Sequence, residues 1–203
     1  MPRRNRGYKK GRPHRDARLF VIIAEGERED AYFKYFDRQN QRIKVQIVKR
    51  EQNRSAPKFF LQRIEKAIET GIYAPKENDF VWFVLDVDRW SRKEIEELQG
   101  HCEKQRNWHL GISNPCFEVW LLYHFIEEID DQGEESKELK TLLHQVSSIG
   151  FDMRQHPNLI KTAQKNAAHA DNFPEQYYPT RMQTKLHILA DQMLQLLGEN
   201  WLK

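Results

Sequence analysis

Short apolar runs of strand length alternate with segments of helical spacing, and this alternation limits the possible folds more than any other feature of the sequence. Four apolar runs are predicted strands: 19–24, 45–48, 80–85 and 108–112. The first and third of these runs are continuous rather than alternating in polarity, which is typical of strands covered on both faces. Apolar residues recur at helical spacing in four segments: 27–39, 57–71, 92–104 and 117–125. This order predicts an α/β fold with a mostly parallel sheet of about four strands and helices on both faces.

The last third of the chain is predicted to be a helical appendage packed on the same domain. Residues 127–138 are acidic and contain Gly133, so we expect a loop there. Apolar residues return at helical spacing after Leu139 and again after Met182, with a turn-rich break at 172–179 between them. The predicted organisation is a basic flexible arm at 1–18, an α/β domain at 19–126 and the appendage at 127–203.

The composition excludes several classes of protein. Hydrophobic residues make up 39% of the 203, including 11 Phe, 7 Tyr and 5 Trp, which is enough to build a core and excludes wholesale disorder. No apolar run approaches the roughly 18 residues of a membrane-spanning helix, and the basic start of the chain lacks the apolar stretch of a signal peptide. The two cysteines cannot by themselves supply a disulfide framework or a four-ligand zinc site. We therefore expect a cytoplasmic protein without a membrane partner.

Positive charge is concentrated at the start of the chain. Residues 1–18 carry a net charge of +7, whereas the whole chain carries +3, which leaves −4 for residues 19–203. Gly7, Gly11 and Pro13 oppose a helix in this arm, and such extended cationic segments are typical of phosphate contacts. The arm predicts nucleic acid, DNA or RNA, as a partner; the alternative is a solvated tail that aids solubility. The candidate contacts are Arg3, Arg4, Arg6, Lys9, Lys10, Arg12, Arg15 and Arg18.

Three acidic residues follow two of the predicted strands. Glu25 comes after the first strand, and Asp86 and Asp88 come after the third. Ligands of open α/β sheets bind outside the carboxyl ends of the strands, and residues two apart in an extended segment face the same side. If the first and third strands are neighbours, the three carboxylates can converge on one Mg²⁺ or Mn²⁺ ion, which prefers oxygen ligands. The alternative is that they are ordinary loop or helix-capping residues.

These residues resemble the acidic motifs of the Toprim domain of topoisomerases, primases and OLD-type nucleases. Residues 112–125, ISNPCFEVWLLYHF, closely resemble the signature of the RloB family, Toprim-like prokaryotic proteins associated with restriction and phage-defence loci. Residues 23–27 and 82–88 fit the same family, so the resemblance extends over about 19–125. One departure is Arg28-Glu29, where the family usually has Thr.

The resemblance implies a Toprim/Rossmann-like fold and Mg²⁺-dependent phosphodiester hydrolysis in phage defence, for example in abortive infection. It implies that Glu25 is the general acid or base, that Asp86 and Asp88 hold the metal, and that Glu118 holds a second metal or orients the first. The alternative for Glu118 is that it only complements the dipole of a helix N-terminus. The resemblance also implies a separate ATPase subunit as a partner. The chain itself has no Gly-x-x-x-x-Gly-Lys-Ser/Thr motif, so any ATP hydrolysis would belong to that subunit.

Two other functions remain open at this point. The first is a non-catalytic subunit that binds nucleic acid or an ATPase. The second is a metal-independent ribonuclease similar to HEPN proteins, which would use Arg181 and His187 on one predicted helix.

Overall fold

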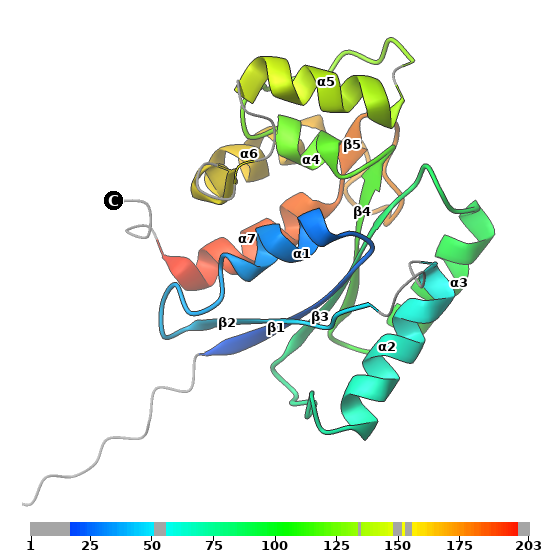
Figure 1. Ribbon diagram of the computed structural model, residues 1–203, viewed down its shortest axis with the longest axis vertical. Helices are drawn as coiled ribbons and strands as arrows, with labels where there is room; N and C mark the ends of the chain where they lie inside the picture. Colours follow the sequence, from blue (N-terminus) through cyan, green and yellow to red (C-terminus); the bar gives the residue numbers. More distant parts are fainter. Residues whose placement is uncertain (1–16, 51–55, 134, 148–151, 153–155, 199–203) are drawn as a thin grey trace, which may run out of the picture.

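The computed structural model describes residues 17–50, 56–133, 135–147, 152 and 156–198. A five-stranded sheet forms its centre, in the order β2-β1-β3-β4-β5 (Figure 1). The strands are β1 (Arg18–Ala24), β2 (Ile43–Ile47), β3 (Phe80–Asp86), β4 (Trp108–Asn114) and β5 (Gln183–Thr184). The first four are parallel and β5 is antiparallel to β4. The predicted α/β class and the pairing of the first and third strands are confirmed, and the sheet has one more short strand than expected.

Helices cover both faces of the sheet. The described residues form α1 (Glu27–Lys34), α2 (Pro57–Glu69), α3 (Arg92–Cys102), α4 (Glu118–Leu122), α5 (Ser136–Ser147), α6 (Ile160–Ala170) and α7 (Leu186–Leu197), with a 3-10 turn at His156–Leu159. Figure 1 shows α2 and α3 on one face, α1 and α7 on the other, and α4, α5 and α6 gathered at one end of the sheet. No helix in the described ranges is long and apolar enough to cross a membrane.

The two faces have separate cores because successive strand residues point in opposite directions. In β1, Phe20 and Ile22 pack with the helices α1, α4 and α7, whereas Val21 and Ile23 pack with α2 and α3. All four side chains are fully buried. A strand covered on both faces must be apolar at every position, which explains the continuous runs in the sequence.

The C-terminal part of the chain belongs to the same sheet and core. The N–H of Lys185 donates to the Ile112 carbonyl (2.8 Å), and Ser113 pairs with Thr184 across β4 and β5. After β5, α7 lies on the sheet so closely that a Cβ at Gly111 would be 2.6 Å from Leu186 Cδ2. The segment after residue 182 therefore packs on the sheet through α7 and supplies β5 to it.

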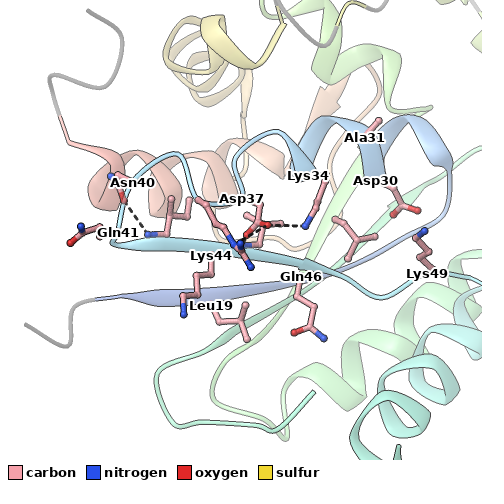
Figure 2. Close-up of a pocket in the computed structure, with 14 residues that line it drawn as sticks. Leu19, Asp30, Ala31, Lys34, Asp37, Asn40, Gln41, Lys44, Gln46 and Lys49 are labelled. Atoms are coloured by element: carbon pink, nitrogen blue, oxygen red, sulfur yellow. Dashed lines mark hydrogen bonds and ion pairs between the residues drawn. The ribbon is translucent and has the colours of Figure 1, made fainter. Parts of the chain in front are cut away.

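The open edge of β2 is occupied by side chains from the loop that precedes it. Asp37 Oδ1 accepts a hydrogen bond from the Val45 N–H (3.0 Å), and Asn40 Oδ1 accepts one from the Ile43 N–H (3.1 Å). Asn40 also donates to the Leu196 carbonyl of α7 (3.1 Å). Figure 2 shows these side chains in a cavity of about 850 Å³ along the strand. The loop thus satisfies backbone groups that an edge strand would otherwise expose.

Candidate functional site

Carboxylates gather where β1 and β3 end. Glu25 directly follows β1, and its N–H donates to the Val84 carbonyl of β3 (3.0 Å), so it lies beside Asp86, the last residue of β3. Glu118, the first residue of α4, and Glu29, in the first turn of α1, line the same cavity of about 230 Å³. This is the point at which the strand order reverses, where open α/β sheets bind ligands.

Glu25 is buried and held by three donors. Its carboxylate accepts hydrogen bonds from Trp90 Nε1 (2.8 Å) and from the Asp86 N–H (3.3 Å), and it lies 3.4 Å from the Arg89 guanidinium. Burial raises the pKa of Glu25, and these three donors oppose that rise. A raised pKa brings a carboxylate closer to the range in which side chains act as general acids or bases at physiological pH.

Glu29 is a buried member of the cluster that the sequence reasoning did not select. Burial raises its pKa to about 7, and the charges of Glu25 and Glu118 add to the effect. Its carboxylate lies against Gly26, where a Cβ would overlap it. Glycine before α1 therefore makes room for a carboxylate inside the cavity.

Asp86 is the carboxylate most affected by its neighbours. Burial raises its pKa well above the ordinary value, and the charges of Glu29, Glu25, Glu118 and Asp88, in decreasing order, raise it further. Several carboxylates share one small space, and each opposes the ionisation of the next. The cavity therefore favours either protons or a cation.

Glu118 and Asp88 are each bound by a neighbouring residue. Arg28 donates to the buried Glu118 carboxylate as an ion pair. Asp88 accepts a hydrogen bond from the Ser136 hydroxyl at the start of α5, and Arg89 Nε lies 4.0 Å from its other oxygen. Asp88 lines an adjoining cavity rather than the one that contains Asp86. The structure thus brings Glu25, Asp86 and Glu118 together and turns Asp88 toward α5.

A buried network joins α1 to α4 and so fixes Glu29 relative to Glu118. The Tyr32 hydroxyl donates to His124 Nε2 (2.9 Å), and His124 Nδ1 donates to the Trp120 carbonyl (2.9 Å). Burial lowers the pKa of His124 to about 3, so the ring stays neutral and Nε2 remains an acceptor.

The donor set fits a hard divalent cation, because carboxylate oxygens are the ligands that Mg²⁺ and Mn²⁺ prefer. Within the described ranges, no three His, Cys, Asp or Glu side chains are arranged to hold a metal ion. Glu25 faces Trp90 and Arg89, and Glu118 faces Arg28. A cation would have to compete with these two guanidinium groups for the same oxygens.

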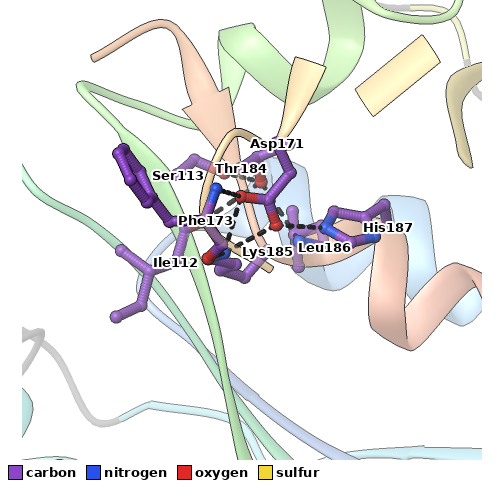
Figure 3. Close-up of polar contacts among 8 residues, drawn as sticks. All are labelled: Ile112, Ser113, Asp171, Phe173, Thr184, Lys185, Leu186 and His187. Carbon is purple, nitrogen blue, oxygen red and sulfur yellow. Dashed lines mark hydrogen bonds and ion pairs between the residues drawn. The ribbon is translucent and has the colours of Figure 1, made fainter. Parts of the chain in front are cut away.

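The residues of the metal-independent alternative lie apart from this cavity. Arg181 is in the turn before β5 and not on a helix with His187, so the prediction of one shared helix was wrong. Arg181 pairs with Asp131 (2.8 Å). His187 Nε2 contacts Asp171, whose carboxylate also binds the buried Lys185 ammonium at 2.6 and 2.8 Å (Figure 3). These contacts tie the segment before β5 to α7.

Most of the predicted nucleic-acid contacts lie outside the described residues, namely Arg3, Arg4, Arg6, Lys9, Lys10, Arg12 and Arg15. Arg18 is described and is the first residue of β1, where its N–H donates to the Arg42 carbonyl (2.8 Å). Its guanidinium donates to the Asn78 carbonyl (3.3 Å). Arg18 therefore belongs to the sheet as well as to the end of the basic segment.

A family model described as RloB-like protein matches residues 20–193, from β1 into α7. No curated protein and no solved structure matches the chain.

Proposed function

The chain belongs to the RloB-like protein family, and from this premise we propose that it is a Mg²⁺- or Mn²⁺-dependent nuclease with a Toprim-like catalytic domain. Its reaction is the hydrolysis of phosphodiester bonds in DNA or RNA. Its setting is cytoplasmic antiviral defence in prokaryotes, with a separate ATPase subunit as a partner. The setting and the ATPase partner rest on the family resemblance of 112–125.

One observation carries the proposal: five acidic side chains line one cavity at the reversal point of the sheet, and the pKa values of three of them are raised. Burial of carboxylates that repel one another costs stability unless a counter-charge is present. Arg28 and Arg89 pair with Glu118 and Glu25, and among the described residues no ion pair engages Glu29 or Asp86. A divalent cation is the counter-charge that matches their chemistry.

Each residue has a role that follows from its position. Asp86 and Glu118 face the cavity from a strand end and a helix start, so they would hold the cation, with Glu29 beside them. Asp88 would join the ligand set by giving up its bond to Ser136. When bound, the cation would neutralise charge on the phosphate and activate the attacking water. Glu25, held by Trp90 and with a raised pKa, moves the proton.

The test is a cleavage assay with labelled single-stranded DNA, duplex DNA, RNA and tRNA, each with Mg²⁺, Mn²⁺ or EDTA. We expect cleavage with metal and none in EDTA. Asp86→Asn should reduce the rate at least 100-fold, on the order of the loss for a group that stabilises the transition state. Asp191→Asn, on the exposed side of α7, is the matched control and should cleave like the wild type.

The possible results separate the alternatives. Wild-type rates in Asp86→Asn would mean that the chemistry lies elsewhere. Binding of nucleic acid or of the ATPase without any cleavage would identify a non-catalytic subunit. Cleavage that continues in EDTA would identify a metal-independent ribonuclease.

A further inference from the structure

We propose that the first turns of α5 form a phosphate-binding wall beside the carboxylate cavity, where Lys137 and Lys140 contact the backbone of a nucleic acid. This inference rests on the proposed function in one respect: the bound nucleic-acid strand would run from the α5 lysines to the carboxylate cavity. It adds a folded contact surface to the one expected from residues 1–18.

Two adjoining cavities define the path. One, of about 640 Å³, is lined by Asp88, Asn114, Pro115, Lys137 and Arg181 among others. The carboxylate cavity of about 230 Å³ lies next to it, because Lys140 lines both. A polymer that occupies the larger cavity therefore reaches the carboxylates past the side chain of Lys140.

The two lysines are held over these cavities and have no counter-ion in the described part of the chain. They are exposed and three residues apart, so they lie on the same side of α5, about 5–6 Å apart at their Cβ atoms. Leu139 and Leu143 are buried and fix the other side of the helix. Among the described residues, no ion pair engages either ammonium group, whereas Arg89 contacts Glu25 and Asp88.

A nucleic acid can approach these two cavities only if cations beside them offset the negative charge of the protein. Residues 19–203 carry a net charge of −4, and the cavity itself is acidic, so the body of the protein repels a phosphate backbone on approach. Unpaired lysines can neutralise phosphates without sequence preference, and each neutralised phosphate releases counter-ions. Lys137 and Lys140 are placed to supply this attraction beside the site.

The experiment measures binding by fluorescence anisotropy in EDTA, so that no cleavage interferes. The probes are labelled single-stranded DNA, duplex DNA and single-stranded RNA, each titrated at several salt concentrations. The Lys137→Ala, Lys140→Ala double variant is compared with a matched control, Lys104→Ala, Arg106→Ala. The control residues precede β4 and lie at the opposite end of the strands.

We expect the α5 variant to lower the slope of log K against log salt by about 1.4 to 1.8, at roughly 0.7 to 0.9 for each lost phosphate contact. The control should bind like the wild type. Loss with only one probe would identify that nucleic acid as the ligand. An unchanged slope in the α5 variant, an equal loss in the control, or no binding of any probe by the wild type would overturn the proposal.

The result is independent of catalysis. If the wild type cleaves no substrate but the α5 variant loses affinity and slope, the binding wall stands and the proposed nuclease activity fails. If the wild type cleaves and the α5 variant binds normally, the wall alone is refuted.

Discussion

Glu29 and Asp86 are carboxylates held where burial and like charges oppose their ionisation. Both bind protons more tightly in the folded chain than in the unfolded one, because their pKa values are raised. A raised carboxyl pKa stabilises the fold at low pH, and this contribution is lost as pH rises from the unfolded value toward the folded one. For Glu29 this window runs from the ordinary carboxyl pKa of 4.5 to about 7.

The pH dependence of stability should therefore change in Glu29→Gln, which cannot titrate. Without metal, the free energy of unfolding of the wild type should fall relative to the variant between pH 4.5 and about pH 7, by up to about 1.4 kcal/mol per pH unit. Urea unfolding at several pH values measures it. The readout is the difference between wild type and variant at each pH. His124, with its pKa lowered to about 3, reduces the stability of the fold below pH 6.5 equally in both proteins.

Added Mg²⁺ should raise the stability of the wild type more at pH 8 than at pH 5, because fewer protons compete for the carboxylates, and it acts by mass action on the folded state. Glu65→Gln, on the exposed side of α2, is the matched control for the charge change. Parallel pH curves for wild type and Glu29→Gln would contradict the assignment of a titrating Glu29.

The residues of the carboxylate cavity were only partly predictable from the sequence. Glu25 and Asp86 could be placed together because strand ends define positions before any side chain is known, and Glu118 was added by the family resemblance. Glu29 could have been found, since it lies four residues after Glu25 and in the first turn of a helix. The donors Trp90 and Arg89 could not, because their reach back to Glu25 depends on the turn after β3.

At the scale of secondary-structure elements, the close approach of α7 to β4 depends on Gly111. A Cβ there would meet the fully buried Leu186, which has little room to move. Gly111→Ala should lower the free energy of unfolding by about 1–3 kcal/mol, as overpacking does in other cores. Urea unfolding measures the change.

Gly100→Ala is a matched control, because Gly100 is in α3 and a Cβ there would have no neighbour within 4 Å outside the helix's own backbone. That change should raise stability by about 0.5–1 kcal/mol through helix propensity. Equal stability of Gly111→Ala and wild type would show that α7 does not press on β4 at this position.

Strands buried on both faces were predictable because their continuous apolar runs leave little ambiguity. Two elements were missed. β5 has two residues, both polar, so it exists only through its pairing with Ser113 and Asn114. α6 follows a 3-10 turn and buries small residues such as Ala163 and Ala167, which give a weak periodic signal.

One predicted boundary also differs from the structure: α1 ends at Lys34 instead of near Gln39.

At the scale of the whole molecule, the basic segment and the folded body carry opposite net charges. Deletion of residues 1–16 should leave stability unchanged, because the contacts of Arg18 with Arg42 and Asn78 remain. Nucleic-acid affinity should fall uniformly across sequences and its salt dependence should flatten, since seven of the cations are removed.

Anisotropy at low salt measures this, with a chain whose seven arm cations are replaced by Ser as the control for length. Unchanged binding after the deletion would identify the segment as a solvated tail. A loss in the deletion but not in the Ser-substituted chain would show that charge is not the cause.

The side chains of Asp37 and Asn40 on β2 have a consequence for how the protein behaves in a crowded solution. An unguarded edge strand recruits the edges of other molecules, and the sheet then grows from one copy to the next. By holding the N–H groups of Val45 and Ile43, the two residues stop such growth at this side. Asp37→Ala should therefore make the protein more prone to self-association, seen as concentration-dependent light scattering that the neighbouring Arg38→Ala does not produce.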